Sequence, residues 1–301
     1  MPILYRPACA GDLERADRLV VASINDLTQR HGFGPMAASR PPNFQLFSLE
    51  DDPDGLWVAE EADEIRGFAW SWACGDLWFL AQLFVSPDHQ GQGIGNELLK
   101  KTFEHAQQSG AATRALITFT FNTVSQGLYI RNGLVPRFPI YNFNIERQRL
   151  TSRLRGPQFR YAPLDETTSD FSDLARIDAR ILGVSRDKHH RYLVSDKETR
   201  GFRLYDGGGD CVGYAYVNSG GHVGPLAVKR PDAMGAALTT ALALAADNGS
   251  SHVSAFLLGA SEMALKVAAE LGMRITFPML LMSTRDFGDW SGYLPRNPGF
   301  M

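Results

Sequence analysis

Cysteine is scarce in this sequence. Its 301 residues include three cysteines, Cys9, Cys74 and Cys211, and no two of them form a C-x-x-C pair. This spacing supports neither a disulfide framework nor a zinc site, so we expect reduced thiols in a cytoplasmic protein. Cys74 is also an unconvincing nucleophile, because no His and Asn context accompanies it.

A metal site is not expected either. The seven histidines include the doublet His189-His190, but no cysteine or carboxylate stands at the spacing typical of a metal site. We therefore interpret the doublet as a solvated helix end, and we predict no bound metal.

Basic blocks and long apolar runs are also missing. The formal net charge is −3, and lysine and arginine form no cluster that would favour nucleic acid. No apolar run is long enough to span a bilayer, and the first residues do not resemble a signal peptide. We therefore expect neither nucleic acid nor a membrane as a partner.

The chain is long enough for two domains and has an ordinary globular composition. Hydrophobic residues make up 44% and charged residues 21% of the chain, so a sizeable core can form. A length of 301 residues is comfortable for two domains and long for one.

The most informative stretch covers residues 80–99. An apolar run ends at Ser86-Pro87, a glycine-rich loop follows, and Leu98 and Leu99 open a helical pattern. The loop places Gly91, Gly93 and Gly95 directly before the helix. Glycines let the backbone turn tightly, and the helix N-terminus attracts negative charge. This arrangement predicts a site for a phosphate or pyrophosphate.

The loop fits one type of phosphate ligand better than others. No Gly-Lys-Ser/Thr follows, so it is not a Walker A motif, and Asn96 replaces the third glycine of a dinucleotide fingerprint. It does match Gln-x-x-Gly-x-Gly through Gln90, Gly93 and Gly95. This motif resembles the acetyl-CoA pyrophosphate loop of the GCN5-related N-acetyltransferase (GNAT) superfamily. The competing interpretation is a glycine-rich turn without a ligand.

A second segment, residues 122–134, strengthens the resemblance. Asn122 is placed to cap a helix, and Gly133 suits a left-handed helix end. In the GNAT superfamily this segment contacts the pantetheine arm, and its tyrosine faces the thioester sulfur. The resemblance therefore implies acetyl-CoA as cosubstrate and gives Tyr129 the role of general acid. The alternative for Tyr129 is a half-buried helix tyrosine. The implied cofactor-binding residues are Leu83, Phe84, Val85, Gln90, Gly91, Gln92, Gly93, Ile94, Gly95, Asn96, Asn122, Ser125 and Tyr129.

The implied reaction is direct transfer of an acetyl group to a primary amine of a small molecule. A protonated amine must lose a proton before it attacks, so a general base or a water relay is needed. The strand before the loop offers only Gln82, which cannot act as a base, so we assign the role to Glu60 or to a water relay. A backbone N–H near Leu83 or Val85 would polarise the thioester carbonyl.

Aromatic residues around the same strands suggest where the amine binds. Phe68, Trp70 and Trp72 alternate along one strand, and Trp78 opens the next. Ordinary sheet packing explains part of this pattern. The functional interpretation is an acceptor pocket that contains Trp70, Trp72 and Trp78. Residues 31–42 are rich in glycine and proline. In the GNAT superfamily this region lies over the acceptor site, so the resemblance implies a mobile substrate loop here.

The second half of the sequence repeats the order of elements of the first. We expect an α/β (α+β) fold with two tandem GNAT-like domains, each a mixed, mostly antiparallel twisted sheet flanked by helices. The predicted domains are residues 1–146 and 158–301, with a linker at 147–157. The second copy has a shorter loop with one glycine, and Ser261 and Ala268 stand where Asn122 and Tyr129 stand in the first. We therefore expect a degenerate C-terminal domain without the chemistry, whose turn-rich tail from residue 290 crosses onto the first half.

Two functions remain open at this point. The first is an active N-acetyltransferase, which the tyrosine favours. The second is a non-catalytic acyl-CoA-binding sensor or regulatory protein, which the missing strand carboxylate favours. The identity of the amine, the general base and the oligomeric state stay open, with a monomeric pseudo-dimer or a homodimer both compatible with a tandem repeat.

Overall fold

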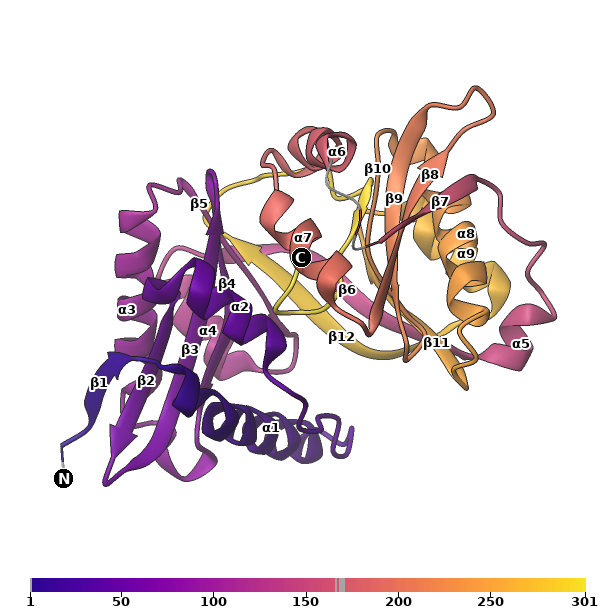
Figure 1. Cartoon of the computed structure of the whole chain (residues 1–301). Helices are drawn as coiled ribbons and strands as arrows, with labels where there is room; N and C mark the ends of the chain where they lie inside the picture. The colour runs from indigo at the N-terminus through magenta and orange to yellow at the C-terminus, as the bar shows by residue number, and fades with distance from the viewer. Residues whose placement is uncertain (1, 166, 168–170) are drawn as a thin grey trace. The chain divides into compact units, whose positions relative to one another are not determined.

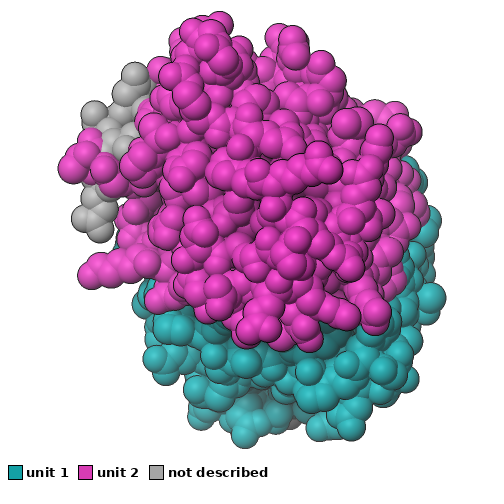
Figure 2. Space-filling model, turned by 90° about the vertical axis from the view of Figure 1, so that its right-hand side faces the viewer, with its two compact units in different colours: residues 1–135, 282–285 teal, residues 136–281, 286–301 magenta. Residues whose placement is uncertain are grey.

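The computed structural model describes residues 2–165, 167 and 171–301. The chain forms two compact units (Figure 2). Unit 1 contains residues 1–135 and 282–285, and unit 2 contains residues 136–281 and 286–301. Each unit is built on a mixed, mostly antiparallel sheet with helices on its faces, as the sequence predicts.

The sheet of unit 1 runs in the order β1-β2-β3-β4-β5 (Figure 1). All neighbours are antiparallel except β4 and β5, which are parallel. The strands are β1 (Leu4–Pro7), β2 (Leu56–Glu61), β3 (Glu64–Cys74), β4 (Leu77–Val85) and β5 (Thr113–Phe119). The helices are α1 (Leu13–Arg30), α2 (Asn43–Asp51), α3 (Ile94–Gln108) and α4 (Thr123–Arg131).

Helices cover both faces of this sheet. On one face, Ile94 and Leu98 of α3 pack on Ala59 and Ala69. Side chains alternate along a strand, so the residues next to these alanines point to the opposite face. On that opposite face, Phe44 of α2 lies edge-on against a tryptophan of β3 with ring centroids 4.9 Å apart. We call the surface covered by α3 the α3 face and the surface covered by α2 the α2 face.

Unit 2 repeats this plan with the order β6-β11-β10-β9-β8-β7, in which β10 and β11 are parallel. Its strands are β6 (Val135–Glu146), β7 (Arg160–Leu164), β8 (Thr199–Tyr205), β9 (Cys211–Asn218), β10 (His222–Val228), β11 (His252–Leu258), β12 (Arg274–Ser283) and β13 (Tyr293–Leu294). Its helices are α5 (Arg147–Thr151), α6 (Ser172–Leu182), α7 (Asp187–Ser195), α8 (Met234–Ala246) and α9 (Glu262–Leu271).

The units differ from the predicted domain boundaries at β6 and β12. The boundary at residue 146 assigns β6 to the first domain, but β6 pairs with β11 from Ile140↔Leu258 to Glu146↔His252 and so belongs to unit 2. The end of β12 joins unit 1 instead, where the Thr284 N–H donates to the carbonyl of Arg114 at 3.0 Å. Such long-range pairing leaves no local signal in the sequence.

The tail of the chain also differs from expectation. Residues 286–301 belong to unit 2 rather than to the first half. Their strand, β13, pairs with β10 through Leu294↔Leu226 and Tyr293↔Ala227.

A buried ionic network fixes two helices of unit 2. Asp178 of α6 accepts hydrogen bonds from Arg186 Nε at 3.0 Å and from the Tyr214 hydroxyl, and its Oδ2 lies 3.1 Å from His190 Nε2. Arg186 also donates to the carbonyl of Met301. All the side chains of this network are buried. Burial raises the pKa of Asp178, but the charges of Arg186 and His190 outweigh it and hold the pKa well below its usual range.

The interpretation of His189-His190 as a solvated helix end is therefore wrong. Both rings are buried, because α7 turns them toward the core of unit 2. His190 stacks on Tyr216 with ring centroids 5.8 Å apart, and His189 packs on Phe300 at 5.0 Å.

No helix in the parts of the chain described by the structure is both long enough and apolar enough to cross a membrane.

We predict that Asp178→Asn destabilises the protein by about 3–5 kcal/mol, because it leaves Arg186 buried without its counter-charge. The depressed pKa of Asp178 contributes stability above the unfolded pKa of about 4, which is lost as pH falls below it. Denaturant unfolding from pH 7 to pH 3 measures both effects. Asp173→Asn is the matched control, since this residue of α6 forms an exposed ion pair with Arg176. An equal loss in the two variants would contradict the prediction.

Candidate functional site

The candidate site begins where β4 and β5 part. The parallel pairing runs from Leu77↔Thr113 to Leu80↔Leu116 and stops there, although β4 continues to Val85 and β5 to Phe119. The edge of β4 that faces β5 therefore has no strand partner after Leu80. An edge with free N–H and C=O groups can bind an extended ligand by backbone hydrogen bonds.

The glycine-rich loop adjoins the end of this opening. After the short 3-10 turn Pro87–His89, Gly91 and Gly93 adopt φ values of 79° and 85°, which glycine reaches without strain. Gly93 is the N-cap residue of α3, and Gly95 lies in the first turn of that helix. The sequence motif therefore folds into the strand, loop and helix that it predicts.

The loop is suited to hold a phosphate group. Among the described residues, no hydrogen bond uses the backbone N–H groups of residues 91–95 as donors. A Cβ atom added at Gly91 or Gly93 would meet nothing within 4 Å, so the space above the loop is open. The positive end of the α3 dipole lies behind these groups. Free donors, open space and the helix dipole together fit a pyrophosphate.

The side chain of Gln90 contacts the end of β4. Its amide donates to the carbonyl oxygen of Val85 at 3.2 Å, and the hydroxyl of Ser23 donates to the same oxygen at 3.1 Å. Gln90 thus ties the loop to β4, and Ser23 ties α1 to the same point. The contact made by Ser23 could not be predicted from local sequence, because the two residues are 62 positions apart.

The second predicted segment forms α4 and ends it as expected. The side chain of Asn122 accepts a hydrogen bond from the Ser125 N–H at 3.2 Å, which caps the helix. Gly133 has φ 82°, and the Leu134 N–H donates to the Tyr129 carbonyl at 3.0 Å, which closes the helix in a left-handed turn.

Tyr129 projects from α4 into a buried environment. Its side chain is 5% exposed, and burial alone raises the pKa of the hydroxyl well above its usual value of 10. The hydroxyl therefore keeps its proton throughout the pH range in which amines lose theirs. A neutral hydroxyl is the state that a proton donor to a leaving thiolate needs.

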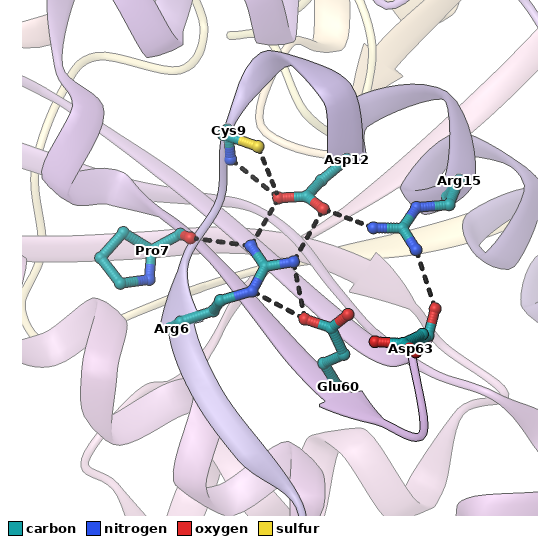
Figure 3. Close-up of polar contacts among 7 residues, drawn as sticks. All are labelled: Arg6, Pro7, Cys9, Asp12, Arg15, Glu60 and Asp63. Carbon is teal, nitrogen blue, oxygen red and sulfur yellow. Dashed lines mark hydrogen bonds and ion pairs between the residues drawn. The ribbon is translucent and has the colours of Figure 1, made fainter.

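Glu60 lies away from this opening, in an ionic cluster beside β1. Its carboxylate accepts a hydrogen bond from Arg6 at 2.7 Å, and Arg6 also binds Asp12 at 2.7 Å (Figure 3). Arg15 donates to Asp12 on its other side. Arg6 lowers the pKa of Asp12 well below its usual range, against the effect of burial.

This cluster makes Glu60 unsuitable as the base. β2 is two strands from β4, which is about 10 Å at the normal strand spacing. The carboxylate is also committed to Arg6. We therefore do not carry Glu60 forward as a catalytic residue.

The structure divides the three predicted pocket tryptophans between two faces. Trp70 and Trp72 point to the α2 face, where Trp72 stacks on Phe79 with ring centroids 5.0 Å apart. Trp78 precedes Phe79 and so points to the α3 face, where its indole donates to His105 Nδ1 at 3.3 Å. Trp78 therefore packs α3 against the sheet and does not share a surface with the other two.

His105 belongs to a buried network that the sequence did not reveal. Its Nδ1 lies 2.9 Å from the Ser71 hydroxyl, and its Nε2 lies 2.9 Å from Asp52 Oδ1. The order Ser-His-Asp is that of a hydrolase triad, but Ser71 lies on the α3 face beneath α3, and its hydroxyl donates to the Gly55 carbonyl at 3.3 Å. The network instead secures α3 to the sheet.

The segment of residues 31–42 is held in its first half by several contacts. The side chain of Asn25 accepts hydrogen bonds from the N–H groups of Met36 and Ala37, both at 2.8 Å. Phe33 stacks on Phe121 with ring centroids 4.8 Å apart. The segment that we expect to be mobile is thus tied to both α1 and the loop before α4.

Unit 2 repeats the helix end found at Tyr129 in unit 1, and a strand covers the edge of β10 that corresponds to the free edge of β4. The Met273 N–H donates to the Ala268 carbonyl at 2.9 Å, which repeats the helix end at Tyr129 with alanine in place of the tyrosine. The N-cap residue of α8 is Ala233 in a right-handed conformation, where α3 has the left-handed Gly93. β13 pairs with β10 over Leu226 and Ala227, so the chain's own tail occupies the edge that stays free on β4.

Comparisons with known proteins agree with these features. The model of the acetyltransferase (GNAT) family matches residues 22–134. An uncharacterized N-acetyltransferase of Archaeoglobus fulgidus is 36% identical over 74 residues, which cover 21% of this chain and 48% of the relative. The match thus spans about half the length of that protein.

Two solved structures resemble the whole chain in fold. A putative acetyltransferase from Pyrococcus horikoshii has a TM-score of 0.75 at 16% identity, covering 99% of this chain and 96% of its own. A tandem GNAT protein from the clavulanic acid biosynthesis pathway has a TM-score of 0.60 at 16% identity, covering 94% and 98%.

The match to the acetyltransferase (GNAT) family covers residues 22–134, which include the loop before α3 and α4. In fold, the whole chain resembles the tandem GNAT protein.

We predict that Asn122→Ala lowers the free energy of unfolding by about 1 kcal/mol, because it removes the side-chain cap of α4. Denaturant unfolding measures the loss. Asn132→Ala at the other end of α4 removes a side-chain bond to the Leu128 carbonyl and serves as the matched control. The N-terminal cap should matter more, since only it satisfies a helix N–H. A larger loss in Asn132→Ala would contradict this assignment.

Proposed function

We propose that the protein is an N-acetyltransferase that transfers an acetyl group from acetyl-CoA to a primary amine of a small molecule. The observation that carries the proposal is the free edge of β4 after Leu80, which leads directly into the glycine loop. The match of residues 22–134 to the acetyltransferase (GNAT) family supports it. The proposal includes a small-molecule amine as substrate and a cytoplasmic location.

Acetyl-CoA would be bound along this free edge. The N–H groups of residues 91–95 would hold its pyrophosphate, and the backbone between Leu83 and Val85 would bind the pantetheine arm. Asn122 and Ser125 lie at the start of α4, which begins four residues after β5 ends. The acetyl group would then lie near the point where β4 and β5 part.

The reaction joins the amine nitrogen to the thioester carbonyl carbon. A backbone N–H of β4 near Leu83 or Val85 would stabilise the oxyanion that forms. The carbon–sulfur bond then breaks, and Tyr129 would give a proton or a hydrogen bond to the leaving thiolate. The amine loses its own proton to water, because β4 carries no carboxylate and Glu60 is paired with Arg6.

The second candidate function is an acyl-CoA-binding sensor without catalysis. The absence of an acidic residue from β4 favours it, since such a residue would be the simplest base. The buried, protonated Tyr129 favours the enzyme, because a binding protein has no need of a proton donor at that place.

We predict that the wild-type protein binds one equivalent of acetyl-CoA and that Gly93→Asp combined with Gly95→Asp abolishes binding. The two carboxylates would repel the pyrophosphate and fill the space above the loop. Isothermal titration calorimetry measures both results. Gly110→Asp is the control, since it introduces the same residue at φ 70° beyond the other end of α3.

Each outcome of this titration has a clear meaning. Retained binding in the double variant would contradict the assignment of the loop. Two equivalents in the wild-type protein would show that unit 2 also binds. No binding at all would overturn both candidate functions.

We predict that kcat falls at least tenfold in Tyr129→Phe, whereas the Kd for acetyl-CoA changes little. In the wild-type protein, kcat/KM should rise with pH as the amine loses its proton and should show no fall near pH 10. The raised pKa of Tyr129 keeps the hydroxyl protonated there. A pH–rate profile with an alkaline limb near pH 10 would contradict a protonated Tyr129 as donor.

A further inference from the structure

Two buried polar atoms on neighbouring strands of unit 1 have no hydrogen-bond partner. They are Nε1 of Trp70 on β3 and Oε1 of Gln82 on β4. Trp70 is 3% exposed, and Gln82 is half-buried. A buried donor or acceptor without a partner destabilises the folded state, so a pair of them calls for an explanation.

The two side chains face the same space. Trp70 and Gln82 are direct cross-strand partners, which places both on the α2 face with Cβ atoms about 5 Å apart. Gln82 is also the second residue of β4 after the pairing with β5 ends at Leu80. Both residues therefore lie on the stretch of sheet where β4 has already parted from β5, close to the place proposed for the acetyl group.

The surroundings of this pair are apolar. The neighbouring positions on the same face, in register with Trp70 and Gln82 along the three strands, are Leu56, Val58, Phe68 and Phe84. Phe44 covers the indole from α2. No charged side chain occupies these register positions, so the strands offer no counter-charge to a carboxylate bound here.

The chemistry of the two atoms limits what can bind. Trp70 Nε1 only donates a hydrogen bond, and Gln82 Oε1 only accepts one. An amine can donate an N–H to Gln82, but its lone pair must remain free to attack the thioester. The acceptor for Trp70 must then be a second atom of the same molecule.

We propose that Trp70 and Gln82 select as acceptor a primary amine that also carries an uncharged oxygen, such as a hydroxyl or an amide carbonyl. Gln82 receives an N–H of the amine, and Trp70 donates to the oxygen. The two residues position the amine and take no part in proton transfer. This inference rests on the proposed acetyltransferase function.

The test compares four amines that share a phenylethyl frame, with acetyl-CoA as donor and the full chain as enzyme. They are 2-phenylethylamine, 2-amino-1-phenylethanol, phenylalaninamide and phenylalanine. The two amines with a neutral oxygen should have kcat/KM about tenfold above that of 2-phenylethylamine, the value of one hydrogen bond. Phenylalanine, with its carboxylate, should be the poorest substrate.

Two variants test whether the preference for a neutral oxygen comes from Trp70 and Gln82. Trp70→Phe keeps a ring but removes the donor, so the advantage of the neutral oxygen should fall to about one. Gln82→Met keeps the length of the side chain and should raise KM for all three neutral amines with little change in kcat. Trp57→Phe is the matched control on the α3 face, where the indole donates to the Asp54 carbonyl, and it should keep the wild-type preference.

Calorimetry with acetyl-CoA on every variant separates the possible failures. If the wild-type protein binds no acetyl-CoA, the proposed function fails and the inference fails with it. If acetyl-CoA binds and the four amines react equally, the inference alone is overturned. The same holds if Trp70→Phe binds acetyl-CoA and keeps the preference for a neutral oxygen. If acetyl-CoA binds and none of the four amines reacts, the result favours the acyl-CoA-binding sensor, and the inference fails together with the proposed function.

Discussion

The parting of β4 and β5 is the constraint on which the rest of unit 1 depends. The two strands pair over only four residue pairs, so the backbone donors and acceptors of β4 beyond Leu80 have no strand partner on that edge. Such groups are costly when they are buried and have no partner. The surrounding elements are arranged around this edge: α1 contacts it through Ser23, the glycine loop through Gln90, and α4 begins shortly after β5 ends.

Unit 2 meets the same constraint in another way. Its β10 and β11 are also parallel over a short stretch, and the edge of β10 is then covered by β13. The helix end at Gly272 repeats the one at Gly133, whereas the loop glycines and the tyrosine are missing. Helix packing is thus kept where the proposed ligand contacts are lost, as is expected when only the fold remains under constraint.

The part of the site that depends on local sequence could be predicted. The left-handed Gly93, the cap at Asn122 and the helix end at Gly133 each follow from residues a few positions apart. Features that depend on long-range contacts could not. The partner of Glu60, the face to which Trp78 points and the burial of His190 are each set by segments distant in the sequence. The exchange of β6 and the end of β12 between the units belongs to the same category, because the alternation of a strand does not reveal its neighbour.

The strand formed by the tail has a consequence for how the two units respond to their surroundings. A segment that is part of the chain is present at a fixed ratio of one to one, so the core of unit 2 is complete at any concentration of small molecules. The open edge of β4 in unit 1 is instead subject to mass action, and any ligand that binds it adds RT ln(1 + [L]/Kd) to the stability of the folded state. One polypeptide would therefore combine a half whose stability is set by its own sequence with a half whose stability rises with the concentration of any ligand that binds the edge of β4.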